Sequence, residues 1–180
     1  MRLLLVRHPK PQVGAGICYG RTDLPASSED TARVHAELIA AGLPGAMPVY
    51  ASPALRCAAL AQRLGAATLA FDARLAEMNF GSWEMRSWDE IGQAAVEAWT
   101  ADLLHFRPGG GECVLDVATR VAGFLGELRQ AGHREALIVC HAGTIRLLQA
   151  LHGGLPLREA ALHAARTPHR IAYGEMLVLS

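Results

Sequence analysis

LLLVRH at residues 3–8 and ALIVCH at residues 136–141 are the stretches of this sequence that decide its fold. Each is a short aliphatic run that stops on a histidine, His8 in the first and His141 in the second. Runs of this length without polar alternation are typical of strands buried on both faces of a sheet. Because open α/β sheets bind their ligands at the carboxyl ends of parallel strands, we expect both histidines at one ligand-binding edge.

The rest of the chain alternates between strand and helix patterns. We expect strands at residues 49–51, 68–71 and 174–179, and helices at 28–41, 53–64, 114 to about 132, 143–151 and in patches between 88 and 104. Ser27 or Ser28 is the expected cap of the first helix, and Ser52 with Pro53 starts the second. This order predicts an α/β domain with a mostly parallel sheet.

Length and charge exclude several classes of protein. The 180 residues are most simply one domain, residues 1–180. Seventeen Lys and Arg balance seventeen Asp and Glu, so no global field draws the chain to nucleic acid or to a membrane surface. The first apolar run is too short for a signal peptide or a membrane span. Four widely spaced cysteines predict free thiols and a cytoplasmic protein. No heptad or sheet-edge pattern decides between a monomer and a homodimer.

The residues around the two histidines predict an oxyanion pocket. Arg7 precedes His8, and Arg56 falls in the first turn of the helix expected after Ser52. Guanidinium groups form bidentate hydrogen bonds with phosphate oxygens, and a helix N-terminus adds N–H donors and the positive end of its dipole. Positive neighbours also keep an imidazole neutral, and a neutral imidazole has one nitrogen free to attack phosphorus.

A leaving alkoxide needs a proton, so a carboxylic acid is expected near this pocket. Glu77 is our candidate, and Glu84 in the same segment is its competitor. Glu112, after the glycine run at 109–111, is expected to be a first-turn helix charge. Six further histidines lack the spacing of metal ligands and are expected in the surface or the core, with no metal site: His35, His105, His133, His152, His163 and His169.

Four motifs together resemble the histidine phosphatase superfamily, also called phosphoglycerate mutase-like. They are LVRH at 5–8, SPALR at 52–56, LAEMNFGSWE at 75–84 and VCHAGTIR at 139–146, in order along nearly the whole chain. The resemblance implies a three-layer α/β/α sandwich and a phosphohistidine mechanism without metal or cofactor. It also implies His8 as the nucleophile, Arg7 and Arg56 as phosphate-binding residues, His141 as a stabilising group and Glu77 as the proton donor.

The segment CYGRTDLP at residues 18–25 resembles the loop of α-ribazole phosphatase-like members of that family. Such members remove the 5′-phosphate of α-ribazole phosphate in cobalamin assembly. We therefore expect a small phosphomonoester substrate of this kind, with Tyr19 and Trp83 lining the mouth of the site. The alternatives are a histidine phosphatase with broad or other small-molecule specificity, a phosphoglycerate mutase, and a non-catalytic protein that binds phosphorylated ligands.

The sequence departs from the family pattern near the nucleophile. Pro9 and Pro11 stand where the family usually has glycine and often threonine, and proline has no N–H to offer to phosphate. We expect Arg21 to compensate by binding phosphate. Met85 also stands where the family commonly has glycine.

Overall fold

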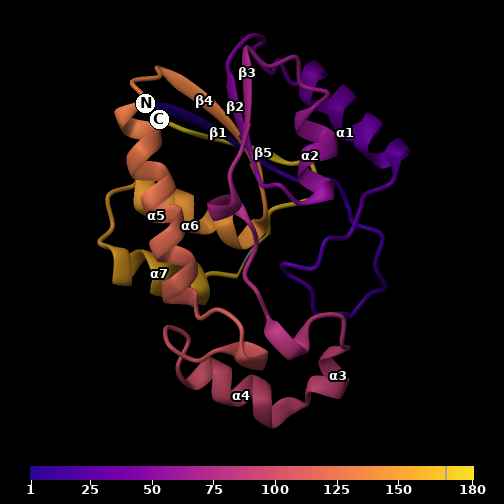
Figure 1. The fold of residues 1–180 in the computed structure, drawn as a ribbon, viewed down its shortest axis with the longest axis vertical. Coiled ribbons are helices and arrows are strands. Elements are labelled where there is room, and N and C mark those ends of the chain that lie inside the picture. The colour runs from indigo at the N-terminus through magenta and orange to yellow at the C-terminus, as the bar shows by residue number, and fades with distance from the viewer. Residues whose placement is uncertain (169) are drawn as a thin grey trace.

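A computed structural model describes residues 1–168 and 170–180 of the chain as a sheet covered by helices on both sides (Figure 1). The sheet has five strands in the order β3-β2-β4-β1-β5. These are β1 (Arg2–Arg7), β2 (Pro48–Ala51), β3 (Thr68–Phe71), β4 (Glu135–Cys140) and β5 (Met176–Leu179). All neighbours pair in parallel except β5, which is antiparallel to β1. The predicted mostly parallel sheet is confirmed.

The two histidine-terminated strands lie side by side at the centre of the sheet. Leu3 pairs with Ala136 and Arg7 with Cys140, so both strands end at the same level. The backbone N–H of His8 continues the ladder and donates to the Cys140 carbonyl oxygen over 3.0 Å. Strand residues after the first are buried on both faces in β1 and in β4, as the absence of polar alternation predicted.

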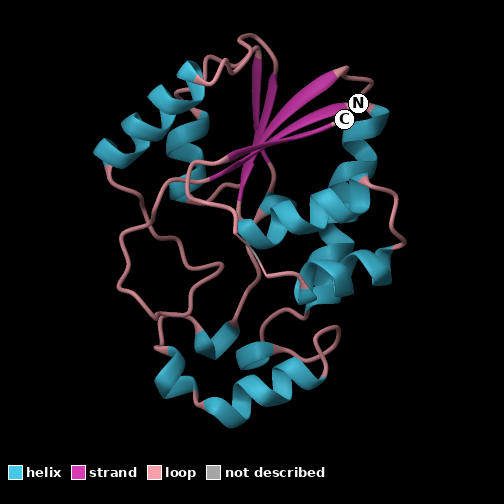
Figure 2. Cartoon of the chain, turned by 180° about the vertical axis from the view of Figure 1, so that it is seen from behind, coloured by secondary structure: helices cyan, strands magenta, loops and turns pink. Residues whose placement is uncertain are grey.

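Helices cover the two faces of this sheet (Figure 2). On one face lie α1 (Ser28–Ala40) and α2 (Leu55–Ala61), and on the other lie α5 (Val114–Gln130), α6 (Ala142–His152) and α7 (Leu157–Arg166). Alternate residues of β1 divide between the two cores: Leu4 and Val6 pack toward α1 and α2, and Leu3 and Leu5 toward the other three helices. Because side chains alternate along a strand, one aliphatic run serves both cores. The three-layer α/β/α architecture is confirmed.

One local prediction needs correction. Ser27 caps α1 as expected, but α2 begins at Leu55 with Ala54 as its N-cap, two residues after Ser52. The Ser52 hydroxyl is buried against His141, and at the helix start it accepts only a long hydrogen bond of 3.4 Å from the N–H of Ala54.

Helix α7 was not expected from the sequence. Its buried face is made of alanines, Ala160, Ala161 and Ala164, so no run of large aliphatic residues marks this face in the sequence.

Residues 81–111 form a separate layer of short helices, which we call the lobe, at the end of the molecule toward which β1 and β4 point (Figures 1 and 2). It contains η2 (Gly81–Trp83), α3 (Trp88–Ile91), α4 (Gln93–Ala101) and η3 (Pro108–Gly110). Its core is small: Trp83 and Ile91 pack with Cys18 from the loop that follows β1. No side chain of α4 is fully buried. The lobe therefore has far less apolar packing than the sandwich.

Backbone conformation explains two features of this lobe. Gly109 has φ 58°, and a Cβ atom there would lie 2.2 Å from the Phe80 carbonyl oxygen, so only glycine allows the two loops to meet. Met85 adopts φ 63°, a left-handed conformation that favours glycine. This conformation accounts for the glycine that the family commonly has at the position of Met85.

Within the described ranges, no helix is long and apolar enough to cross a membrane. The four cysteines are buried and free, as expected: Cys18, Cys57, Cys113 and Cys140.

Candidate active site

His8 and His141 meet at the carboxyl ends of β1 and β4. Their ring centroids are 5.0 Å apart, and the two side chains are 2% and 1% exposed. The parallel pairing of two neighbouring strands that end together brings the histidines to one point. Their predicted proximity is confirmed.

The tautomer of His8 is set by its own loop. Its Nδ1 lies 2.7 Å from the Pro9 carbonyl oxygen, and because a carbonyl can only accept, Nδ1 carries the hydrogen and Nε2 carries the lone pair. Burial, followed by the nearby charges of Arg56 and Arg7, lowers the pKa of His8 from its ordinary 6.5 to about 3, although the bond to Pro9 opposes this. The imidazole is therefore neutral at physiological pH, with Nε2 free.

His141 is held in a fixed orientation by two side chains. Its Nδ1 lies 3.3 Å from Nη2 of Arg56, a group that can only donate, so Nδ1 accepts and Nε2 carries the hydrogen. That Nε2–H donates to Oγ of Ser52 over 2.9 Å. Burial and then the neighbouring His8 hold the pKa of His141 well below its ordinary value. The second histidine is therefore also neutral and presents a hydrogen-bond donor.

Two buried guanidinium groups stand beside the histidines. Arg56, 1% exposed, donates from Nη1 to the Thr22 carbonyl over 2.9 Å and from Nη2 to the Gly20 carbonyl over 2.6 Å. Arg7 donates from Nη1 to the Ile171 carbonyl. The Nε atoms of both arginines are buried and have no partner among the described residues. Two buried cations held by neutral carbonyls, each with an unused N–H, make a site that an anion would complete.

Two tyrosines close over these arginines. The Tyr173 ring centroid lies 3.8 Å from Cζ of Arg7, and the Tyr19 centroid lies 5.8 Å from Cζ of Arg56. Their hydroxyl oxygens are 2.7 Å apart, so one donates to the other. Burial, followed by this hydrogen bond, raises the pKa of Tyr19 above its ordinary value. The pair joins the loop after β1 to the turn before β5 on top of the arginines.

Glu77 faces the same space from the segment that follows β3. Its Oε2 accepts from the N–H of Gly143 over 3.0 Å and its Oε1 from the N–H of Met78 over 3.1 Å. Gly143 lies in the first turn of α6, and a Cβ there would come within 2.5 Å of Oε1. Glycine at 143 is thus what allows the carboxyl group to lie against the helix start.

Glu84 has a structural role. It accepts hydrogen bonds from the backbone N–H groups of Gly20, Arg21 and Phe80 at 2.9–3.0 Å, and also binds the Thr22 hydroxyl. Burial raises the pKa of Glu84, but these hydrogen bonds outweigh it and hold the pKa below its ordinary value. Glu84 therefore fixes the loop that carries Tyr19, whereas Glu77 lines the cavity.

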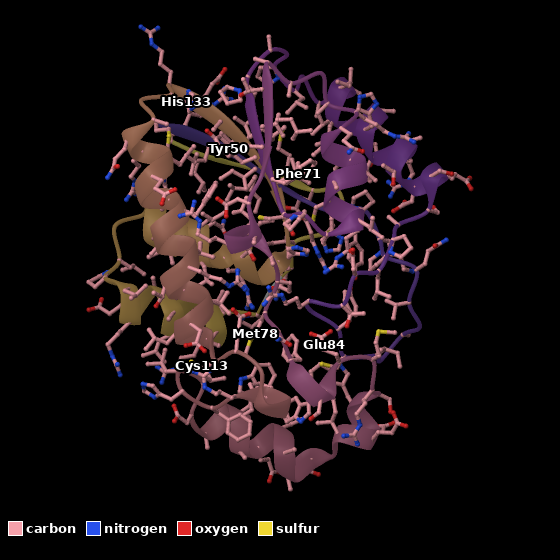
Figure 3. All side chains as sticks on the ribbon, viewed as in Figure 1. Tyr50, Phe71, Met78, Glu84, Cys113 and His133 are labelled. Atoms are coloured by element: carbon pink, nitrogen blue, oxygen red, sulfur yellow. The ribbon has the colours of Figure 1, made fainter. Side chains whose placement is uncertain are left out.

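A cavity of about 720 Å³ joins these groups to the lobe. Its inner end is lined by the two histidines, the two arginines, Glu77 and Tyr19, and its outer end by aromatic side chains that include Phe80, Trp88 and Trp99. Met78 also lines it, and Figure 3 shows Met78 and Glu84 where the chain passes from the sandwich to the lobe.

Two predicted site residues lie elsewhere. Arg21 is exposed, does not line the cavity, and contributes its backbone N–H to Glu84. Trp83 is 7% exposed and packs in the lobe core, with its ring centroid 6.1 Å from that of Trp99. The predicted phosphate contact of Arg21 and the predicted place of Trp83 at the mouth are therefore not found, because neither side chain lines the cavity.

Three other residues singled out in the sequence have defined contacts in the structure. Glu112 precedes the N-cap of α5 and is not in its first turn; it accepts from the N–H of Asn79 and from Arg120, both over 2.9 Å. Pro9 contributes its carbonyl to His8, and Pro11 forms a bridge with Ala26.

Of the six remaining histidines, His169 lies outside the described residues. The other five are partly or fully exposed: His35, His105, His133, His152 and His163. In the part of the chain that the structure describes, no three His, Cys, Asp or Glu side chains are grouped as a metal site would need.

The sequence did not identify several residues of the site. Tyr173, Trp88 and Trp99 come from segments with no recognisable motif, and their positions depend on how the lobe and the last turn fold back over β1. Ser52 was assigned to a helix cap, although its place in a motif with Arg56 could have marked it.

Several known proteins similar to this chain are named as phosphatases. A sequence model of the histidine phosphatase superfamily (branch 1) matches residues 3–170. The adenosylcobalamin/alpha-ribazole phosphatase of Escherichia coli K12 is 38% identical over 93 residues, which cover 49% of this chain and only 45% of that enzyme. A putative phosphoserine phosphatase 2 of Hydrogenobacter thermophilus is 27% identical over 168 residues, or 88% of this chain and 81% of that protein.

A solved structure with the same fold is the alpha-ribazole phosphatase from Shigella flexneri. It superposes with a TM-score of 0.84 and 26% sequence identity, and the match covers 100% of this chain and 90% of that one.

Proposed function

Because the chain belongs to the histidine phosphatase superfamily (branch 1), whose members are phosphatases, we propose that it hydrolyses a phosphomonoester through a phosphohistidine on His8. One observation carries the proposal. Nδ1 of His8 is occupied by the Pro9 carbonyl, so the lone pair on Nε2 is available beside two buried arginines with unused N–H groups. A neutral nucleophile next to an unfilled anion site is what attack on a phosphoryl group requires.

In the first step, Nε2 of His8 attacks phosphorus. The N–P bond forms while the bond from phosphorus to the ester oxygen breaks, and the carboxylic acid of Glu77 gives its proton to the leaving oxygen. In the second step, the Glu77 carboxylate takes a proton from water, and the resulting hydroxide oxygen bonds to phosphorus as the N–P bond breaks. Inorganic phosphate leaves, and His8 and Glu77 return to their starting forms.

The other groups stabilise the transferring phosphoryl. The Nε–H groups of Arg7 and Arg56 donate to its non-bridging oxygens, and both guanidinium charges offset the charge that develops there. His141 is the third group, and its Nε2–H must exchange its bond to Ser52 for one to the phosphoryl as charge develops there. None of these steps uses a metal ion or a cofactor.

We assign α-ribazole 5′-phosphate as the substrate. The identity to the Escherichia coli enzyme and the structural similarity to the Shigella flexneri enzyme support this assignment, and so does the aromatic outer end of the cavity. A phosphatase of broader small-molecule specificity is the alternative.

The test of the reaction uses p-nitrophenyl phosphate in the presence of EDTA. Hydrolysis is expected to continue with EDTA and to vanish in His8→Ala, and acid quenching should be avoided because phosphohistidine is acid-labile. Mass spectrometry at neutral pH is expected to find one phosphoryl group on the peptide that contains His8. Loss of activity with EDTA, or activity in His8→Ala, would contradict the mechanism.

The test of the substrate is a panel of α-ribazole 5′-phosphate, 3-phosphoglycerate, phosphoserine, nucleotide monophosphates and sugar phosphates. We expect kcat/KM for α-ribazole 5′-phosphate to exceed the others by at least about a hundredfold, or about 2.7 kcal/mol of transition-state binding. Equal values across the panel would favour the broader phosphatase.

A further inference from the structure

The cavity is much larger than a phosphoryl group needs. At about 720 Å³ it lies in the range of pockets that enclose a drug-sized ligand. The histidines and arginines occupy only its inner end, and its outer walls come from Ile17, Leu103 and Val114 together with the aromatic residues of the lobe. The outer part is therefore available to whatever group the phosphoryl is attached to.

The aromatic wall is packed edge to face. The Phe80 ring centroid is 6.5 Å from that of Trp88 and 5.8 Å from that of Trp99, with interplanar angles of 88° and 85°. Trp83 packs against Trp99 in the same way, with an interplanar angle of 77°. Because its neighbours hold Trp99 from two sides, its indole is positioned before any ligand binds.

The unused polar group in this wall is a donor. Nε1 of Trp99 is buried without a partner among the described residues. The Thr100 hydroxyl donates to the Glu97 carbonyl, and both oxygens of Glu77 already accept backbone N–H groups. A buried donor without an acceptor costs free energy, and a ligand that brings an acceptor recovers it.

We propose that the outer part of the cavity is a slot for a flat aromatic or heteroaromatic leaving group that carries a hydrogen-bond acceptor, and that the indole N–H of Trp99 selects this acceptor. The proposal rests on the phosphatase function above and specifies its substrate class. Trp99 is a specificity-determining residue in this assignment; it takes no part in the transfer of the phosphoryl group.

A leaving group with a carboxylate is the competing class, because Arg146 also lines the cavity and its Nε is buried without a partner in the described ranges. The character of the cavity walls disfavours it, because the apolar and aromatic residues of the outer end suit a flat ring and offer a carboxylate no further donor apart from Trp99.

The experiment compares matched ligands. Naphthylmethyl phosphate and a set of quinolinylmethyl phosphates have the same shape and differ by one ring nitrogen acceptor, and glycerol phosphate lacks the ring. We expect kcat/KM for the best quinoline isomer to exceed that for the naphthalene compound by about tenfold, or about 1.4 kcal/mol. Both are expected to exceed glycerol phosphate by at least a hundredfold.

Trp99→Phe keeps an aromatic ring and removes the N–H, so it is expected to bring the quinoline-to-naphthalene ratio close to one. Trp83→Phe is the matched control, since it makes the same chemical change in the same cluster outside the cavity, and the ratio should stay near ten. An unchanged ratio in Trp99→Phe, an equal fall in Trp83→Phe, or a preference for phosphoserine over every ring-bearing ester would overturn the assignment of the slot.

Calorimetry with the corresponding phosphonates, which cannot be hydrolysed, measures the same ratio as Kd without any turnover. If no ester is hydrolysed and no phosphohistidine forms, the proposed function fails, while the phosphonate Kd ratio still decides the slot. If esters are hydrolysed with no preference for the ring nitrogen, only the slot fails.

Discussion

The two ends of the active-site cavity are built in different ways. At the inner end, His8 and His141 follow the two central strands, are almost completely buried, and are held by contacts with Pro9 and Ser52. At the outer end, the walls come from a lobe with a small core and a helix, α4, without one fully buried side chain. The groups assigned to chemistry thus lie in the most buried part of the molecule, and those assigned to selection in its least packed part. The two properties can therefore change separately.

The largest effect is expected at the inner end, from Arg56→Ala. This change removes a donor to the phosphoryl group together with the bonds to the Gly20 and Thr22 carbonyls. Loss of one such donor costs about a hundredfold to a thousandfold in kcat, and the loosened loop should add to it. Steady-state assays with p-nitrophenyl phosphate measure the fall, and inorganic phosphate should inhibit the variant more weakly.

The control for Arg56→Ala is Arg21→Ala. Arg21 lies in the same loop but its side chain is exposed and outside the cavity, so we expect kcat/KM within about twofold of the unchanged protein. A fall in kcat/KM for Arg21→Ala as large as that for Arg56→Ala would support the expectation that Arg21 binds phosphate. The phosphate-binding end of the cavity would then include the loop residue Arg21.

The next effect is expected from Glu77→Gln, which removes the proton donor at nearly constant shape. For alkyl esters, kcat should fall by about a hundredfold, because the alkoxide leaves without a proton. Nitrophenolate leaves readily, so p-nitrophenyl phosphate should give a burst of one equivalent followed by slow turnover, since Glu77 is also needed to activate water. Stopped-flow absorbance measures the burst.

Glu84→Gln distinguishes the structural role assigned to Glu84 from the catalytic role assigned to Glu77. Glu84 binds the N–H groups of one loop, so its change is expected to lower the midpoint of thermal unfolding and to leave no burst. A burst in Glu84→Gln, and none in Glu77→Gln, would exchange the two assignments.

The inner end could be predicted from the sequence, and the physical reason is local. The aliphatic runs before His8 and His141 specify strands, and parallel strands place their last residues at one edge. Arg56 is expected from its place at the start of a helix and Glu77 as the acid that a leaving alkoxide needs, and the family resemblance implies the same two residues. The alanine face of α7 gave no such signal, because its buried residues are small and no run of large aliphatic residues marks it.

The outer end could not be predicted, because it depends on contacts between segments distant in sequence. Tyr173 reaches Arg7 only because the last turn crosses the end of β1, and Trp99 reaches the cavity only because the lobe folds back. Trp83 lies in a family-like motif and Trp99 in none, yet Trp99 is the one that lines the cavity. Motifs identified the groups that bind the phosphoryl, whereas selection of the leaving group required the structure.

Acid should destabilise the inner end in a defined pH range. The folded pKa of His8 is about 3 and the ordinary value is 6.5, so between these values the unfolded chain binds the proton and the folded one does not. The contribution of neutral His8 to stability is therefore complete above pH 6.5 and is lost as the pH falls toward 3. At pH 4.5 the loss is about 2.7 kcal/mol, from two pH units below 6.5.

Urea unfolding of the unchanged protein and of His8→Asn at pH 7.5 and pH 4.5 measures this loss. The free energy of unfolding of His8→Asn should fall less between the two pH values, by about 2.7 kcal/mol, because one titrating group is gone. His141 remains and titrates in the same direction, so some fall should persist. Equal falls in both proteins would mean that His8 is not the buried neutral group described here.

The smallest effect is expected at the outer end, from Ile91→Ala. Ile91 belongs to a cluster whose buried members are only Cys18, Trp83 and Ile91 itself, so its truncation should cost about 1 to 2 kcal/mol, less than in a deep core. If the lobe opens separately from the sandwich, amide hydrogen exchange in residues 88–104 should accelerate about tenfold while exchange in β1 and β4 stays the same.

Ile145→Ala, in α6 beneath the sheet, is the matched control and should lower the stability of the whole protein by about 2 to 5 kcal/mol. The Ile91→Ala protein should also show a severalfold higher KM for ring-bearing esters, with kcat for glycerol phosphate within twofold, because only the slot is loosened. A uniform rise in exchange across β1, β4 and the lobe would mean that the two ends unfold as one unit, and selection could then not be altered without disturbing the chemistry.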